Sequence, residues 1–225
     1  MSRPTYLQEQ FEDMHQQTFT ATLGMWAFLT TEVLFFGAIF VAYAVCRLRW
    51  QEEFRHGSAD LQLWIGAINT AVLLTSSLFI ALAVRSAKAG HRSMLVVNLI
   101  ITLIFGLMFL GFKGYEYSVE SDESLVPILN WSTIPPDEVG LPPSQQHPRP
   151  EQQKLFMSFY FFMTALHATH MIVGIGVISV LTTLSWRGRY TAEHHNPIEI
   201  GALYWHFVDI VWVFLFPALY LLRTG

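Results

Sequence analysis

The segment MLVVNLIITLIFGLMFLGF, residues 94–112, contains no Asp, Glu, Lys or Arg. In lipid, backbone polar groups must be satisfied within their own segment, and an apolar run of this length without strand-like alternation does so as a helix. Four further apolar runs lie at about 21–46, 61–84, 155–184 and 201–222. The sequence therefore predicts an all-α protein, a bundle of five transmembrane helices.

The composition supports a membrane protein. Hydrophobic residues make up 52% of the chain and charged residues only 13%, whereas a soluble domain is about 25% charged. The net charge of −4 and the absence of a basic patch exclude nucleic acid as a partner. We expect residues 1–225 to form a single multi-pass membrane domain.

Residues 118–153 hold seven of the ten prolines and are predicted to form a loop outside the membrane. Its apolar residues could let part of the loop pack on a neighbour; these are Leu125, Val126, Ile128, Leu129 and Trp131.

Charge alone does not fix the orientation. With the N-terminus inside, six of the 13 Lys and Arg residues lie on the cytoplasmic side. Short loops count most in the positive-inside rule, and Arg85, Lys88 and Arg92 crowd one tight connection. This weighting favours a cytoplasmic N-terminus.

Glu32 lies near the middle of the first span. Helical spacing surrounds it with apolar side chains at three or four residues' distance, namely Phe28, Leu29, Phe35 and Phe36. A carboxyl group in hydrocarbon needs a partner or a proton. Two interpretations stay open: a hydrogen bond between helices, or a part in proton traffic or chemical reactivity.

Two pairs of polar residues share an i, i+3 spacing in the last two spans. His167 and His170 form one pair, and His206 and Asp209 form the other. Such pairs can face a common metal or haem, and Asp209 could orient His206. The alternative is that these residues join helices and contact lipid headgroups. We expect no metal site, because further ligands are missing.

The order of motifs resembles subunit III of the haem-copper cytochrome c oxidases. The resembling segments touch every span; they are WAFLTTEVLFF (26–36), INTAVLLTSS (68–77), LGFKGYEY (110–117), FYFFMTALHATHMIVG (159–174) and YWHFVDIVWVFLF (204–216). The chain departs from the mitochondrial form of this family, which has seven spans. It also has Ala165 and Ala168 where glycines are common in the family.

The resemblance assigns family positions to several residues of this chain. The family's carbodiimide-reactive intramembrane carboxylate falls on Glu32, and its motif at a helix end falls on Glu116 and Tyr117. The paired histidines fall on His167 and His170. The family's WHFVD block falls on residues 205–209, which include His206 and Asp209.

The resemblance also implies a function. It predicts a non-redox subunit of a bacterial respiratory oxidase in the cytoplasmic membrane, packed with subunits I and II. It leaves open contact with subunits of other respiratory complexes. Haem and copper are expected in the partner subunits and none in this chain, which would bind phospholipid and support proton uptake and stability. The alternatives are a subunit of a quinol oxidase or nitric oxide reductase and, more remotely, a metal-dependent membrane oxygenase.

Overall fold

The computed structural model describes residues 10–127, 129, 131–145, 148–192 and 194–221. Within them the chain forms six α-helices and two short 3-10 turns, at Pro136–Glu138 and Pro143–Gln145. The helices are α1 (Met14–Arg49), α2 (Gln51–Ala59), α3 (Leu63–Lys88), α4 (Arg92–Asp122), α5 (Glu151–Trp186) and α6 (Asn196–Tyr220). Five of them are long and apolar enough to cross a membrane, which confirms the predicted all-α bundle.

Each long helix extends beyond its predicted span at one or both ends, although α3 begins two residues later than predicted. At the start of α1, the Asp13 side chain accepts a hydrogen bond from the Gln16 backbone N–H at 2.6 Å, so the helix begins in polar sequence. The predicted loop 118–153 is too long, because α4 continues to Asp122 and α5 begins at Glu151. The extension of α4 includes Glu120, whose side chain is buried against the bundle.

The first connection holds a helix that the sequence did not predict. Helix α2 packs against α5, with Phe54 fully buried, while Gly57 lets the Phe156 ring approach closely. A nine-residue amphipathic helix lacks the long apolar run on which the prediction of the spans depended.

The connection between α4 and α5 is anchored at its base. The Arg149 guanidinium donates hydrogen bonds to the carbonyl oxygens of Glu123 (3.2 Å) and Ser132 (3.3 Å) and lies over the Trp131 ring. Of the apolar residues predicted to pack, Leu125 is fully buried and Trp131 is half-buried, while Leu129 is exposed. Val126 is half-buried, and Ile128 lies outside the described residues.

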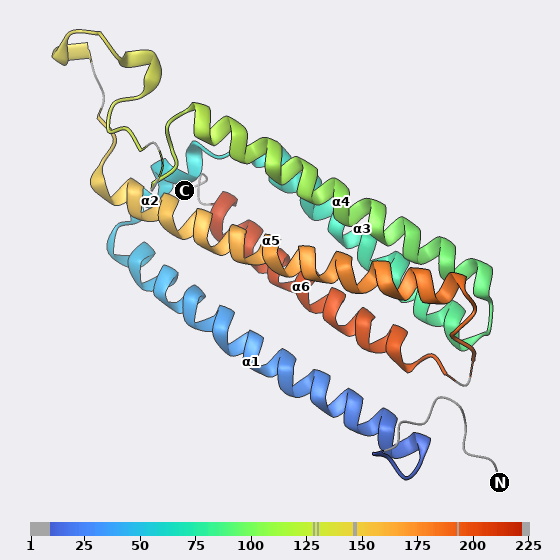
Figure 1. Ribbon diagram of the computed structural model, residues 1–225. Coiled ribbons are helices and arrows are strands. Elements are labelled where there is room, and N and C mark those ends of the chain that lie inside the picture. The colour runs from blue at the N-terminus through green and yellow to red at the C-terminus, as the bar shows by residue number, and fades with distance from the viewer. Residues whose placement is uncertain (1–9, 128, 130, 146–147, 193, 222–225) are drawn as a thin grey trace.

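The five long helices run side by side, with α1 on the outside (Figure 1). Helix α6 packs against α1, α3 and α5. In its most apolar segment 56% of residues are buried, against 17% in α1, so α6 is the central helix. The end of α6 is tied to the outer elements, because Tyr43 of α1 donates a hydrogen bond to the Ala218 carbonyl and Ser58 of α2 donates one to Leu219. These bonds satisfy carbonyl groups that the helix end leaves free.

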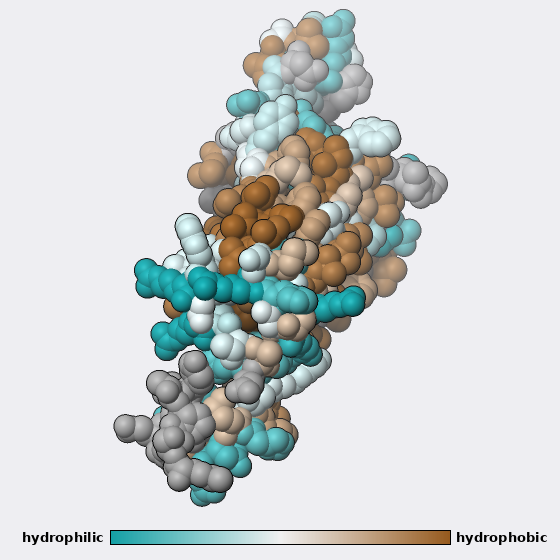
Figure 2. Space-filling view, turned by 90° about the vertical axis from the view of Figure 1, so that its right-hand side faces the viewer, coloured by the Kyte–Doolittle hydropathy of each residue, from teal (hydrophilic) through white to brown (hydrophobic). Residues whose placement is uncertain are grey.

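Polar side chains gather at the end of the molecule that carries the α3–α4 and α5–α6 connections (Figure 2). There Lys88 pairs with Glu199 at 2.7 Å, and Arg92 donates hydrogen bonds to the carbonyls of Ser185 and Trp186. Apolar side chains cover the bundle beyond this end (Figure 2). This distribution suits a bundle whose end reaches water while its flank faces lipid.

Trp205 joins four helices at the centre of the bundle. Its indole N–H donates to the Ser76 hydroxyl of α3 at 3.0 Å, and its ring is fully buried. The ring lies close to Gly106 of α4 and Gly174 of α5, where a Cβ atom would come within 2.7 Å and 3.1 Å of ring carbons. The two glycines therefore make room for the indole.

Replacing Gly106 with Ala is expected to destabilise the bundle by about 1–3 kcal/mol, because the added methyl group overpacks a rigid buried ring. Gly111→Ala is the matched control in the same helix, where a Cβ atom meets nothing within 4 Å. Thermal denaturation of the purified complex should show a lower midpoint for Gly106→Ala only. Equal midpoints for the two variants would contradict this account of the Trp205 contact.

Candidate functional site

Glu32 and His170 form a pair between α1 and α5. The Oε2 atom of Glu32 lies 3.1 Å from Nε2 of His170, and the two side chains are 19% and 15% exposed. The other ring nitrogen, Nδ1, lies 2.9 Å from the Leu166 carbonyl oxygen. A carbonyl oxygen only accepts, so Nδ1 carries a hydrogen and the Glu32–His170 bond holds one shared proton. The pair is either a carboxylate with an imidazolium or a carboxylic acid with a neutral imidazole.

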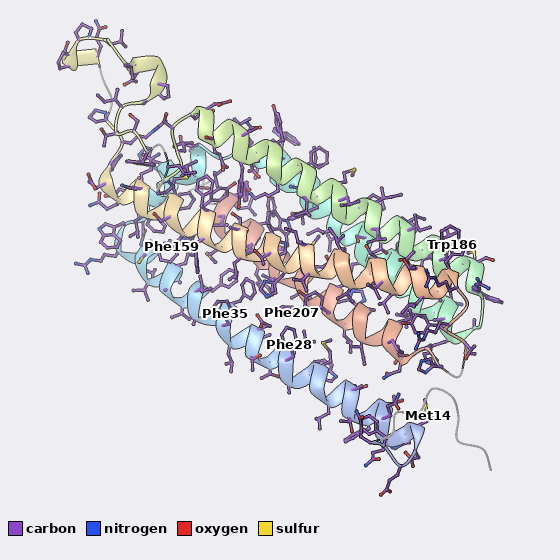
Figure 3. All side chains as sticks on the ribbon, viewed as in Figure 1. Met14, Phe28, Phe35, Phe159, Trp186 and Phe207 are labelled. Atoms are coloured by element: carbon purple, nitrogen blue, oxygen red, sulfur yellow. The ribbon has the colours of Figure 1, made fainter. Side chains whose placement is uncertain are left out.

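Aromatic side chains surround this pair. The Phe36 ring lies edge-on to the His170 ring at 5.3 Å, and the Tyr204 hydroxyl donates to the His170 carbonyl at 3.0 Å. Phe28 and Phe207 lie between α1 and the helices α5 and α6 (Figure 3); the Phe28 ring is 6.1 Å from the Tyr204 ring, and the Phe207 ring is 6.2 Å from the Phe36 ring. The predicted apolar surroundings of Glu32 are therefore present, and its hydrogen-bond partner, His170, comes from α5.

His167 faces a different direction from His170. Three residues advance a helix by about 300°, which leaves the two rings about 60° apart around α5. His167 is buried between Phe109 of α4 and Trp212 of α6, at ring distances of 5.4 Å and 5.1 Å. Neither of its ring nitrogens has a hydrogen-bond partner among the described residues.

His206 and Asp209 also have separate surroundings. Nδ1 of His206 lies 2.7 Å from the Ser77 hydroxyl oxygen of α3, so Ser77, and not Asp209, orients this ring. The Asp209 side chain is buried, and its oxygens form no hydrogen bond with the described residues. His170 therefore pairs with α1 and His206 with α3, and the described residues show no hydrogen bond between the two pairs. That His167, His170, His206 and Asp209 together serve lipid or helix contact stays a prediction.

Glu116 and Tyr117 lie inside α4, and the helix continues past them to Asp122. Glu116 is buried and accepts hydrogen bonds from Lys113 at 2.8 Å and from the Tyr220 hydroxyl at 2.7 Å. The Tyr117 hydroxyl lies 2.7 Å from the Thr164 hydroxyl of α5.

Lys113 is the centre of a polar cluster that the sequence reading missed. Its ammonium group donates to Glu116, Tyr160 and Tyr220, each at 2.8 Å. It also lies over the Tyr160 ring, 4.5 Å from the ring centre. Buried cations persist when they are paired and hydrogen-bonded in this way. Three residues from α4, α5 and α6 thus meet at one ammonium group.

The signal for this Lys113 cluster was present in the sequence. Lys113, Glu116 and Glu120 follow one another at spacings of three and four, which places them on one face of a helix. All three are buried. The predicted third span ends at residue 112, so Lys113 was expected beside the loop.

An apolar groove runs between α1 and α6. It has a volume of about 360 Å³, and Trp26, Val33 and Leu34 line its α1 wall. Thr30 also lines the groove, but its hydroxyl donates to the Trp26 carbonyl at 2.8 Å and is satisfied within its own helix. His206 lies at the α6 wall. The groove is therefore almost wholly apolar.

Metal ligands do not gather in the part of the chain that the structure describes. No three His, Cys, Asp or Glu side chains there lie close enough to hold an ion. The expectation of no metal in this chain stays a prediction.

The comparisons with known proteins match nearly the whole chain. The family model described as "Cytochrome c oxidase subunit III" matches residues 5–124 and 152–223. A protein named "Cytochrome c oxidase subunit 3" from Thermostichus vulcanus is 29% identical over 209 residues, covering 92% of this chain and 90% of the relative. "Probable quinol oxidase subunit 3" from Staphylococcus epidermidis is 31% identical over 206 residues, covering 89% of this chain and 88% of the relative.

Plant relatives are longer. "Cytochrome c oxidase subunit 3" from Triticum aestivum is 30% identical over 203 residues, which cover 88% of this chain but only 66% of the relative. The five apolar helices and the match over most of the chain agree. The chain therefore belongs to the cytochrome c oxidase subunit III family, whose members are subunits of membrane-bound respiratory oxidases.

Proposed function

We propose that this chain is the non-redox subunit III of a bacterial cytochrome c oxidase in the cytoplasmic membrane. It packs on subunit I, binds phospholipid, and supports proton uptake and stability during aerobic respiration, while subunits I and II hold the haem and copper. The N-terminus lies on the cytoplasmic side. Family membership supports the oxidase assignment, and the short connection with Arg85, Lys88 and Arg92 supports the orientation.

The apolar groove between α1 and α6 is the observation that carries the lipid-binding part of the proposal. Its volume of about 360 Å³ falls in the range of ligand pockets, about 300–1,000 Å³. Because its walls are apolar and lie on helices long enough to span a membrane, an acyl chain suits it better than a polar ligand. A lipid there would fill the space beside the loosely packed α1.

A quinol oxidase is the second candidate, because relatives with both names match this chain at similar identity. The two assignments differ in the electron donor and in the partner subunits. Oxygen consumption by the purified complex with reduced cytochrome c, and separately with a quinol, decides between them.

Removal of this chain from the complex is expected to leave the haem and copper spectra unchanged, because the metals belong to other subunits. Initial turnover should persist but fall more steeply at high pH, where proton supply becomes limiting. The enzyme should also inactivate sooner, because removal of these helices exposes apolar surface of subunit I and changes the electrostatic field near its proton entrance. Steady-state assays across pH, with and without this chain, test the proposal.

The control is the depleted complex after the chain is added back, which should recover the original pH profile and lifetime. Identical pH profiles and turnover lifetimes before and after depletion would contradict the proposed role and leave assembly as the function of this subunit.

A further inference from the structure

A second groove, between α3 and α6, leads from the polar end of the bundle into its apolar part. It has a volume of about 310 Å³, with Ala81, Val84 and Lys88 on one wall and Glu199, Ala202 and His206 on the other. Lys88 and Glu199 lie at the mouth and pair at 2.7 Å. His206 lies seven residues further along α6 than Glu199, which is a rise of about 10 Å. The groove thus connects a charged mouth with an imidazole inside the membrane-spanning segment.

The inner end of this groove continues as a polar path into the bundle. Nδ1 of His206 lies 2.7 Å from the Ser77 hydroxyl oxygen. A hydroxyl group can both donate and accept, and so can an imidazole through its two nitrogens. The Ser77 hydroxyl also adjoins the Asp209 carboxyl, although the two form no hydrogen bond in this arrangement. The transfer proposed below therefore includes a movement of the Ser77 side chain from His206 toward Asp209.

Asp209 is the end of this path. Only 2% of the residue is exposed, and neither carboxyl oxygen has a hydrogen-bond partner among the described residues. An ionised carboxylate without a partner is strongly disfavoured in such surroundings. The carboxyl group therefore needs a proton, and the path through Ser77 and His206 is the route that the structure offers.

We propose that the groove between α3 and α6 is a proton-binding site that loads Asp209 from the polar end of the bundle through His206 and Ser77. Water in the groove gives a proton to Nε2 of neutral His206, which then gives up its Nδ1 proton to Ser77. Ser77 passes its own hydroxyl proton to the Asp209 carboxylate. One proton enters at Nε2 of His206 and one proton arrives at the Asp209 carboxyl group. No electron moves, and the reverse sequence releases the proton.

The charges around the groove favour a proton over an anionic lipid headgroup. Lys88 is the cation that lines the groove, and its ammonium group is already neutralised by Glu199. The other hollow that His206 lines, the apolar groove beside α1, has no ionisable side chain besides His206 itself. Neither wall leaves a free positive charge for a phosphate group.

Infrared spectroscopy of the intact complex tests this site. A C=O stretch from a protonated carboxyl group should be present in the wild-type complex and absent in Asp209→Asn. After rapid mixing into D₂O this band should shift, and in Ser77→Ala the shift should be about 100-fold slower, because the relay is broken. Thr75→Val is the matched control in the same helix; its hydroxyl donates to the Ala71 carbonyl at 2.8 Å, and it should exchange at the wild-type rate.

Ala81→Phe tests the groove without changing a polar group, since Ala81 lines the wall of α3. The Ala81→Phe variant should slow the hydrogen–deuterium exchange at Asp209 as Ser77→Ala does. Ala81→Ser is the matched control and should exchange at the wild-type rate. If Asp209→Asn fails to assemble, isotopic labelling of aspartate assigns the band in the unaltered chain.

Three results would overturn the proposal. One is the absence of a protonated Asp209 band, and another is exchange at the wild-type rate in Ser77→Ala. The third is an Ala81→Phe complex that loses a bound phospholipid while its exchange is unchanged, because the groove would then hold lipid. None of these results depends on the electron donor of the oxidase.

Discussion

Lys113→Met is expected to destabilise the helix bundle by about 3–5 kcal/mol, because removal of one partner leaves a buried charge without compensation. The ammonium group of Lys113 bonds to Glu116 of its own helix, to Tyr160 of α5 and to Tyr220 of α6. Its loss therefore removes three hydrogen bonds and leaves Glu116 and Glu120 buried together. The loss should lower the thermal midpoint of the complex and the amount of this chain that stays bound.

The double variant Lys113→Met with Glu116→Leu should be more stable than Lys113→Met alone, since it removes the uncompensated carboxylate as well. Lys154→Met is the matched control, because Lys154 is only partly buried in α5. Thermal denaturation and subunit retention measure both effects. If Lys113→Met and Lys154→Met behaved alike, the buried cluster would not stabilise the fold.

Glu32→Lys is expected to detach α1 from the bundle, whereas Glu32→Gln should leave assembly intact. A lysine places a cation at membrane depth, which costs about 2.5–3.5 kcal/mol. It also places this cation directly beside His170. A glutamine keeps the shape, and its amide N–H can donate to Nε2 of His170 because Nδ1 already carries the hydrogen. The ratio of this chain to its partner subunits after purification measures the difference.

Glu52→Lys is the control for this charge reversal, since the Glu52 side chain is 70% exposed on α2, where it pairs with Arg55. It should co-purify at the normal ratio. A Glu32→Lys complex with normal yield and thermal stability would show that Glu32 faces water or an anionic partner, contrary to the arrangement described.

The spans were predictable because uninterrupted apolar runs have few alternatives in lipid. Their ends were not, because a helix such as α4 continues into polar sequence when a side chain such as Glu120 is buried against its neighbours. Helix α2 lacks a long apolar run, and only its contact with α5 reveals why Phe54 is buried.

The polar residues show where sequence spacing stops being informative. Spacing placed His167 and His170 on one helix face, but a difference of about 60° was enough to direct one toward Trp212 and the other toward Glu32. The partners of Lys113 come from residues 47 and 107 positions away. Partners at such separations depend on how the helices pack against one another, and the spacing of residues along one helix does not reveal this packing.

The claim that this chain is a non-redox oxidase subunit is tested most directly by purifying the complex through a tag on this chain and recording its optical spectrum and peptide content. We predict that a larger haem-containing subunit co-purifies, with oxygen-reducing activity, and that the haem stays with that subunit when this chain is removed. Recovery of this chain without haem, while the oxidase activity remains in the untagged fraction, would contradict the account, as would haem bound to the isolated chain.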